Sequence, residues 1–225
     1  FSDSKLPRAV WTGAPVRRSI RTLDRSTHRT RARQQWGIGE KQFFIGVIGG
    51  SLGSGALNDA VQRVVRDMAD DSTVSIRHVV GPRFYDERIG TDPASSRLKV
   101  DYRVVPYEDD MVTMYGAIDL LIARGGAGTV AEVAATGVPA VLVPWDGAAD
   151  DHQRENVKWL SDKGGAILLE EKRVGEDLAR VVQELRLDEA ERLEMGRIAW
   201  RMGERNRSGA IAQLIDSVVR SEARR

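Results

Sequence analysis

The strongest constraint on this chain is a regular alternation of short apolar runs with longer amphipathic segments. Short apolar runs are typical of buried strands, and helices between them connect neighbouring strands in parallel. The sequence therefore predicts an α/β fold: a Rossmann-like, doubly wound parallel sheet with a helical C-terminal tail. The expected strands are 43–48, 74–80, 100–105, 120–123, 140–143 and 166–169, and the expected helices are 56–68, 82–88, 109–115, 130–136, 151–163 and most of 175–225.

Composition excludes several classes of protein. The chain has 225 residues, 41% of them hydrophobic, and a formal net charge of +1, which indicates a folded domain with a sizeable core. The near-neutral charge argues against a nucleic-acid-binding protein. Cysteine is absent, so disulfides, cysteine-ligated zinc and cysteine nucleophiles are excluded. No apolar run approaches the roughly 20 residues that span a bilayer.

Charge is concentrated at the start of the chain. Residues 1–36 carry nine Lys or Arg side chains and two Asp side chains. This segment either presents a solvated helix face or contacts phosphate or an anionic lipid surface. Because the chain opens at Phe1 with neither a signal peptide nor an obvious helix cap, we interpret it as a piece of a longer protein, cut near a domain junction.

The first loop with recognisable chemistry is GGSLGSG, residues 49–55, which follows the first expected strand. Its glycines let the backbone approach a ligand, and the next helix presents unpaired amides, so Gly50, Ser51 and Gly53 become candidates for phosphate binding. A plain turn capped by Ser51 or Ser54 explains the same residues. The loop matches neither a Walker motif nor G-x-G-x-x-G.

A second glycine-rich loop, RGGAGT at residues 124–129, follows the strand that ends at Ala123. It lies at the same edge of the predicted sheet, where ligands of such folds bind. About one turn into the next helix, the Glu132 carboxylate is suited to accept hydrogen bonds from ribose hydroxyls. The alternative is an acidic residue favoured by the helix dipole.

The third loop, residues 145–156, leads into a helix whose first turns carry His152, Gln153 and Asn156. These side chains suit the hydroxyl and amide groups of a sugar, although an exposed polar helix start explains them too. A metal site is a weaker alternative because the acids beside His152 have no clear partner. We interpret His28 and His78 as structural. A fourth segment, TGAPVR at residues 12–17, offers Arg17, whose guanidinium is suited to phosphate or a base edge.

Taken together, these loops resemble the MurG family, the peptidoglycan N-acetylglucosaminyltransferases. The resemblance rests on TGAPVR, GGSLG, PYEDDM, ARGGAGTVAEVAATGVPAVLVPW and DDHQRENV, in this order, and covers nearly the whole chain. It implies the carboxyl-terminal half of a GT-B enzyme, in which this half binds UDP-N-acetylglucosamine (UDP-GlcNAc). The other half would receive lipid I at the membrane surface. Residues 1–36 would then be the inter-domain junction with a first helix, and 37–225 the donor-binding domain with its C-terminal helices.

The resemblance also implies positions for the donor. Arg17 and the loop 50–53 would lie beside the nucleotide and its diphosphate, and residues 126–129 would line the diphosphate. Residues 107–111 would lie beside the uracil. Glu132 would contact the ribose, and residues 152–156 would contact the GlcNAc ring. The backbone at Tyr107 and Glu108 would recognise the edge of the uracil base. The implied substrate-binding residues are Arg17, Gly50, Ser51, Gly53, Tyr107, Glu108, Met111, Gly126, Ala127, Gly128, Thr129, Glu132, His152, Gln153 and Asn156.

Some positions depart from the family pattern. Ala14 stands where the family has Asn, Leu52 where it has Gln, and Gly125 where it has Ser. The family's candidate general base lies in a G-G-T-G-G-H loop of the amino-terminal half, which this chain lacks, so no catalytic residue is assigned here. No D-x-D motif is present, and we expect neither a metal nor a cofactor at the diphosphate.

The resemblance implies inverting transfer of GlcNAc to lipid I, giving lipid II, at the inner face of the bacterial cell membrane. We expect this chain alone to bind the donor weakly and to transfer nothing. One alternative is a non-catalytic donor-binding subunit of a two-chain UDP-sugar glycosyltransferase. Another is half of a UDP-sugar epimerase, which requires cleft carboxylates and a histidine; only His152 qualifies. We expect the tail, 189–225, to pack on this domain and its end to reach toward the missing half.

Overall fold

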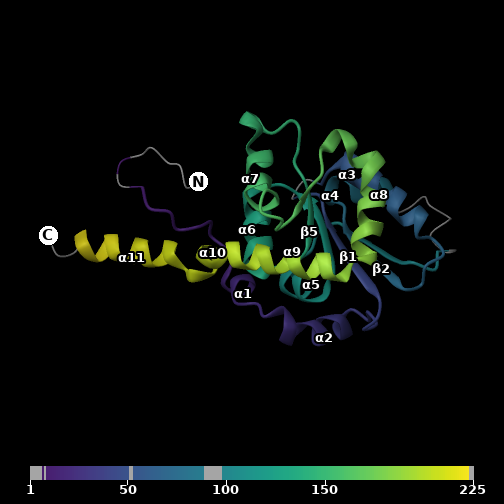
Figure 1. Ribbon diagram of the computed structural model, residues 1–225, viewed down its shortest axis with the longest axis horizontal. Helices are drawn as coiled ribbons and strands as arrows, with labels where there is room; N and C mark the ends of the chain where they lie inside the picture. Colours follow the sequence, from purple (N-terminus) through teal and green to yellow (C-terminus); the bar gives the residue numbers. More distant parts are fainter. Residues whose placement is uncertain (1–6, 8, 51–52, 89–97, 223–225) are drawn as a thin grey trace.

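The centre of the computed structural model is a parallel six-stranded sheet in the order β3-β2-β1-β4-β5-β6 (Figure 1). The structure describes residue 7 and residues 9–50, 53–88 and 98–222. The chain runs from β1 outward to β3, then returns to the other side of β1. The strands are β1 (Phe43–Ile48), β2 (Val74–Val79), β3 (Asp101–Val105), β4 (Leu120–Arg124), β5 (Ala140–Val143) and β6 (Ile167–Leu168).

Helices connect these strands, and the predicted doubly wound α/β fold is confirmed. Helix α3 begins one residue earlier than predicted, and α6, at Ala127, and α8, at Glu171, begin earlier by about one turn. The glycines before residue 130 suggested a loop, but a helix tolerates them in its first turn. The helices are α1 (Arg18–Arg21), α2 (Arg25–Gln35), α3 (Gly55–Asp67), α4 (Pro82–Arg88), α5 (Met111–Ala117), α6 (Ala127–Thr136), η2 (Ala149–Asp151), α7 (His152–Ser161), α8 (Glu171–Leu187), α9 (Glu189–Met202), α10 (Glu204–Ser208) and α11 (Ala210–Glu222).

The two faces of the sheet bury alternate residues of each strand. In β1, Ile45 and Val47 join the core under α3 and α8, whereas Phe44 joins the core under α2, α5 and α6. In β4, Ile122 faces the first core and Leu121 the second. Successive side chains of a strand point to opposite faces, so apolar residues at every position require cover on both sides.

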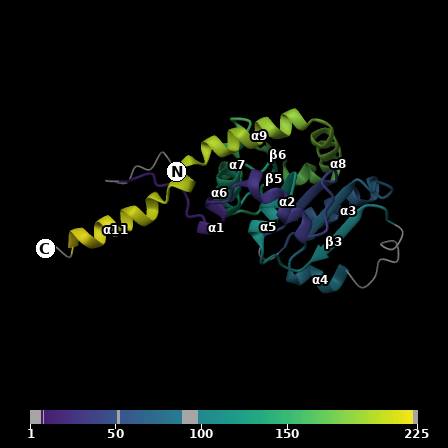
Figure 2. The ribbon, with the colours of Figure 1, turned by 90° about the horizontal axis from the view of Figure 1, so that it is seen from below.

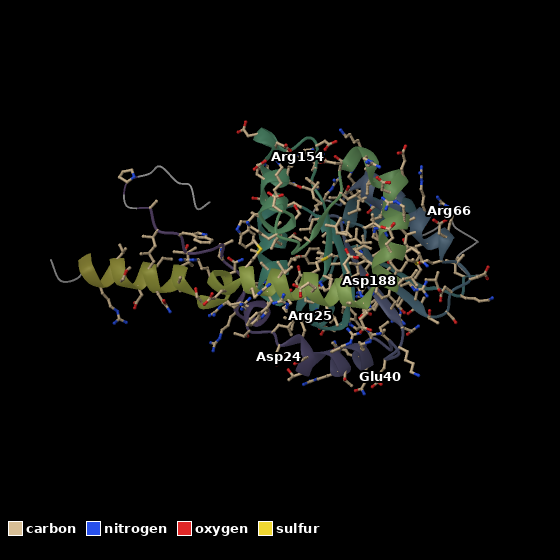
Figure 3. All side chains as sticks on the ribbon, in the orientation of Figure 1. Asp24, Arg25, Glu40, Arg66, Arg154 and Asp188 are labelled. Carbon is tan, nitrogen blue, oxygen red and sulfur yellow. The ribbon has the colours of Figure 1, made fainter. Side chains whose placement is uncertain are left out.

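The basic residues of the first helices serve the fold. The Arg25 guanidinium, labelled in Figure 3, donates to the carbonyl oxygens of Tyr115 at 2.8 Å and Ile118 at 2.5 Å. Burial lowers the pKa of Arg25 to about 10. Arg33 is buried and donates to Asp119 at 3.2 Å. These contacts attach α2 to α5 and to the start of β4, which reduces the charge available for phosphate or lipid. They do not test the division expected at residue 36.

The C-terminal helices behave in two ways. Helix α9 packs against α6, and Gly203 lies so close to α6 that a Cβ there would overlap the carbonyl oxygen of Ala134. Helix α11, by contrast, extends away from the body (Figures 1 and 2), and its Ile215 and Val219 side chains are each 60% exposed. The expectation that the tail packs on this domain is confirmed for α9 and α10, which contact α6, and is wrong for most of the apolar face of α11, which stays exposed. That the end of the tail reaches toward the missing half stays a prediction. None of the described helices is long and apolar enough to span a bilayer.

The buried Arg33 contact gives a test of the fold. Replacing Arg33 by Met removes the guanidinium bonds to Asp119 and to the carbonyl oxygens of Ala117 and Gly39. We expect Arg33→Met to lower the free energy of unfolding by about 3 kcal/mol. Exposed Arg31 is the matched control. Arg31→Met should change the free energy of unfolding by less than about 0.5 kcal/mol. Urea denaturation measures both, and equal effects would contradict the structural role of Arg33.

Candidate functional site

The site predicted from the loops lies where the strand order reverses. Strands β1 and β4 are neighbours, with Ile48 opposite Ala123 at their carboxyl ends. Consequently the loop after β1 and the loop after β4 leave the same edge of the sheet side by side. In open α/β sheets the crevice at such a switch point is where ligands bind. Ser51 and Leu52 lie outside the described residues.

The glycines of these two loops fall into two groups. Gly53 has a φ of +76°, and a Cβ there would overlap the carbonyl oxygen of Val80, so the packing of the protein itself requires this glycine. By contrast, a Cβ at Gly50, Gly126 or Gly128 would meet nothing within 4 Å. Gly50 has a φ of +89°, a backbone conformation that itself favours glycine. Neither packing nor a positive φ explains Gly126 and Gly128, which leave room for a ligand to approach the backbone.

The N-terminus of α6 opens at this crevice. Gly126 is the N-cap and supplies no side-chain hydrogen bond. Because the helix begins at Ala127, the residues predicted as loop, 127–129, form its first turn, and their N–H groups have no partner within the helix. These amides and the helix dipole together favour an anion. The earlier helix start thus strengthens the predicted phosphate site.

Glu132 and Arg17 come together beside α5, although they are far apart in sequence. The Tyr115 hydroxyl donates to Glu132 Oε2 at 2.8 Å, and Arg17 Nη2 lies 4.0 Å from Glu132 Oε1. The Glu132 side chain is 20% exposed, so its carboxylate is fixed on one side and open on the other. Burial, and then the neighbouring carboxylate, raises the pKa of Tyr115 well above its ordinary value. Tyr115 therefore remains a donor.

At the predicted uracil contact, the Glu108 side chain is buried rather than free. Its Oε2 atom accepts a hydrogen bond from Arg77 Nε at 2.5 Å, and its Oε1 atom accepts one from the backbone N–H of Asp110 at 2.9 Å. Tyr107 beside it is 57% exposed, and Met111 is half-buried at the start of α5. The Glu108 carboxylate fixes this turn, and the predicted contact of its backbone with the uracil stays a prediction.

The polar residues of the third loop hold that loop in place. Gln153 Oε1 accepts a hydrogen bond from the backbone N–H of Trp145 at 3.1 Å, and Asn156 Nδ2 donates to the carbonyl oxygen of Gly125 at 3.3 Å. His152 Nδ1 contacts the Ala149 carbonyl oxygen at 2.7 Å. This loop is therefore attached to the loop after β4.

The same loop contains a strained segment. Asp150 and Asp151 have φ values of 50° and 52°, which non-glycine residues rarely adopt. Arg154, labelled in Figure 3, lies 2.7 Å from the carboxylate of Asp151 and also pairs with Glu170. These contacts hold the strained turn at the start of α7. Backbone strain of this kind is typical of functional sites.

A cleft of about 670 Å³ lies between α6, α7 and the segment 10–15. Ala127, His152 and Asn156 line it, together with the indole rings of Trp11 and Trp159. The structure therefore brings part of the predicted set together around α6, in two groups, and the uracil-contact residues 107–111 belong to neither. One group borders this cleft, whereas Arg17 and Glu132 meet on the side of α6 that faces α5.

Gly125, a departure from the family pattern, has a packing explanation. A Cβ at this position would lie 2.5 Å from Val157 Cγ2 and 3.0 Å from the carbonyl oxygen of Gln153. The absence of a side chain thus lets α7 pack directly on the loop after β4. His78, predicted to be structural, is buried between Tyr102 and Asn58. Within the described ranges, no group of His, Asp and Glu side chains is arranged to hold a metal ion.

Sequence reasoning missed two residues at this edge of the sheet. Arg124 and Glu171 form an ion pair, and Arg124 also contacts Ser54, the N-cap of α3. The sequence offered one signal: Arg124 is a charged residue at the end of an otherwise fully buried strand. Nothing in the sequence identified Glu171 as its partner.

Comparison with known proteins identifies the family. Residues 44–214 match the Glycosyltransferase family 28 C-terminal domain. The chain belongs to this family. A family 28 relative from Acidothermus cellulolyticus, UDP-N-acetylglucosamine--N-acetylmuramyl-(pentapeptide) pyrophosphoryl-undecaprenol N-acetylglucosamine transferase, is 36% identical over 216 residues. These cover 96% of this chain and 58% of the relative. The protein of the same name from Burkholderia mallei is 35% identical, with 96% of this chain and 55% of the relative covered.

Solved structures agree with this family. MurG of Acinetobacter baumannii superposes with a TM-score of 0.71 at 26% identity, covering 96% of this chain and 57% of that one. Anabaena HepE, in complex with UDP and glucose, superposes with a TM-score of 0.59 at 15% identity over 92% of this chain and 55% of that one, which shows the fold alone. The predicted resemblance to MurG and the predicted fold, that of a GT-B carboxyl-terminal domain, are confirmed. The chain spans little more than half the length of these relatives.

The Tyr115–Glu132 contact gives a pH-dependent prediction. Because the folded pKa of Tyr115 is raised, its contribution to stability is fully present below the unfolded value of about 10 and is lost as pH rises above it. Tyr115→Phe removes the hydrogen bond to Glu132 and should cost about 1 kcal/mol at neutral pH. The difference in the free energy of unfolding between the parent chain and Tyr115→Phe should therefore become smaller as the pH rises above about 10. Urea denaturation from about pH 7 to about pH 11 measures the difference, and a pH-independent difference would contradict the buried donor.

Proposed function

We propose that this chain is the UDP-GlcNAc-binding half of an inverting N-acetylglucosaminyltransferase that converts lipid I to lipid II. The family, the names of the relatives and the switch-point crevice support this proposal. The acceptor, lipid I, would be held through the half of the enzyme that these residues do not include. The enzyme would act as a peripheral protein at the cytoplasmic face of the bacterial membrane, with anionic lipid as a further contact.

The observation that carries the proposal is the N-terminus of α6, where neither packing nor a positive φ explains Gly126 and Gly128, beside the loop after β1. We assign the diphosphate to this place, against the backbone of Gly50 and of 126–129, with Ser51 nearby. A diphosphate needs donors at short range, and a glycine backbone supplies N–H groups without a side chain in the way. Gly53 would contribute by shaping the turn.

The nucleoside would occupy the α5 side of the crevice. Glu132 would offer Oε1, which lies 4.0 Å from Arg17, to the ribose hydroxyls, since Tyr115 holds Oε2. The uracil would meet the backbone at Tyr107 and Glu108, with Met111 beside it. Arg17, largely exposed and 4.0 Å from Glu132, would reach the nucleotide and its diphosphate.

The sugar would lie toward α7. His152, Gln153 and Asn156 occupy the first turns of that helix, beside the start of α6. Gln153 and Asn156 each use one polar atom to hold the loops, and the other polar atom of each would contact the GlcNAc ring. Preoriented polar groups of this kind give specificity at low entropic cost.

The chemistry follows from this arrangement. The acceptor hydroxyl attacks the anomeric carbon, the bond to the diphosphate oxygen breaks, and the configuration inverts. UDP leaves with added negative charge, which the α6 N-terminus and Arg17 would stabilise. The proton of the acceptor hydroxyl would go to a base in the amino-terminal half. This chain alone would therefore bind the donor and transfer nothing.

Calorimetry tests the binding proposal directly. We expect the 225-residue chain to bind UDP and UDP-GlcNAc weakly. GDP is the control nucleotide and should bind less well, because the proposed backbone contact at 107–108 would suit uracil rather than guanine. An assay with a lipid I analogue should detect no transfer of GlcNAc. Heat with UDP-GlcNAc no greater than with GDP would contradict the proposal.

A substitution at Gly126 tests the diphosphate position. Since a Cβ there meets no protein atom within 4 Å, Gly126→Ala should change the free energy of unfolding by less than about 1 kcal/mol. The same Cβ would obstruct the diphosphate and lower UDP affinity about tenfold. Gly116→Ala in α5, where the added Cβ makes ordinary contacts with Ala32 and His28, is the matched control and should leave UDP affinity unchanged. Unchanged UDP binding by Gly126→Ala would exclude this position.

A further inference from the structure

Arg124 occupies a particular place in the site. It is the last residue of β4, beside β1 at the switch point, and leads through Gly125 to the N-cap of α6. Its side chain is 11% exposed, although the residue is charged. A buried guanidinium at the edge where ligands bind requires partners that justify its burial.

The partners of Arg124 come from different loops. Its Nη2 atom donates to Ser54 Oγ at 2.5 Å, and Ser54 Oγ in turn accepts a hydrogen bond from the N–H of Leu57 at the start of α3. Its Nη1 atom donates to the carbonyl oxygens of Val143 at 3.4 Å and Pro144 at 3.3 Å, where β5 ends. One guanidinium therefore joins the loop after β1 to the loop after β5.

Glu171 completes the arrangement from the start of α8. One carboxylate oxygen pairs with Arg124, and the other accepts a hydrogen bond from the backbone N–H of Asp146 at 2.9 Å. This carboxylate neutralises the charge of Arg124 and fixes the loop after β5 a second time. Because its charge is already balanced, Arg124 is suited to hold loops rather than to serve as the main anion ligand.

We propose that Arg124, held by Glu171, is a positioning residue for the donor diphosphate. Its planar guanidinium sets the spacing between the loop after β1, the start of α6 and the loop after β5, whose backbone and side chains would contact the donor. This inference rests on the proposed function. Neither a lysine nor an apolar side chain reproduces the fork of donors that reaches Ser54 and Val143 together.

The chain provides a matched control at the opposite end of the same strand. Arg33 is also a buried arginine paired with a carboxylate, Asp119, but that pair lies just before β4 begins. Weakening either pair perturbs β4 and its attachment to the fold. Only the Arg124 pair adjoins the loops assigned to the diphosphate. We therefore expect changes at either pair to lower stability, but only changes at the Arg124 pair to lower UDP affinity relative to uridine affinity.

The experiment compares UDP with uridine on the 225-residue chain and its variants by calorimetry. We expect Arg124→Lys to lower UDP affinity about tenfold while uridine affinity changes by less than about twofold. Glu171→Gln should shift UDP affinity in the same direction but less, because the amide oxygen still accepts. Arg33→Lys should lower the unfolding midpoint and leave the ratio of UDP to uridine affinity unchanged.

The outcomes separate the two proposals. A parent chain that binds no UDP overturns the proposed function and this inference with it. A parent chain that binds UDP, with Arg124→Lys and Glu171→Gln binding it equally well, overturns only the positioning role. If Arg124→Lys loses UDP affinity and uridine affinity equally, the positioning role is also overturned, since a merely structural role predicts an equal loss. Should Arg124→Lys fail to fold, the UDP-to-uridine ratio of Glu171→Gln decides.

Discussion

The constraint on which the rest of this structure depends is the common direction of its strands. Every pairing in the sheet is parallel, so the carboxyl ends of all the strands lie at the same edge of the sheet. The reversal of strand order between β1 and β4 then separates two helix starts and leaves a crevice between them. Glycine loops, the α6 N-terminus and the polar start of α7 lie at this edge for that reason alone.

The loops at this edge are connected by buried polar contacts rather than left to fluctuate independently. Arg124 joins the first and third loops, Asn156 joins α7 to the loop after β4, and Tyr115 fixes Glu132 from α5. Each contact satisfies a buried polar group, whose isolation would be costly. Contacts of this kind hold the loops in one arrangement, which lowers the entropic cost of binding a ligand there.

The opposite edge of the sheet illustrates how charge serves the fold. The basic start of the chain suggested contact with phosphate or lipid, yet Arg25, Arg29 and Arg33 bind carbonyl oxygens and Asp119. Charge counting along a sequence cannot distinguish a solvated arginine from one that attaches a helix to the core. Arg17 remains exposed and lies beside Glu132, and the uncharged residues 10–15 line the cleft beside α6 and α7.

The sequence by itself determined the fold class, the positions of the strands and the loops that carry the site, because apolar periodicity and glycine are local signals. It also indicated Glu132 and Arg17, but it could not show that they meet. Tertiary structure alone decided that Gly53 serves packing while Gly126 stays open, that α11 extends from the body, and that Arg124 pairs with Glu171. These properties depend on contacts between residues distant in sequence, for which no local pattern exists.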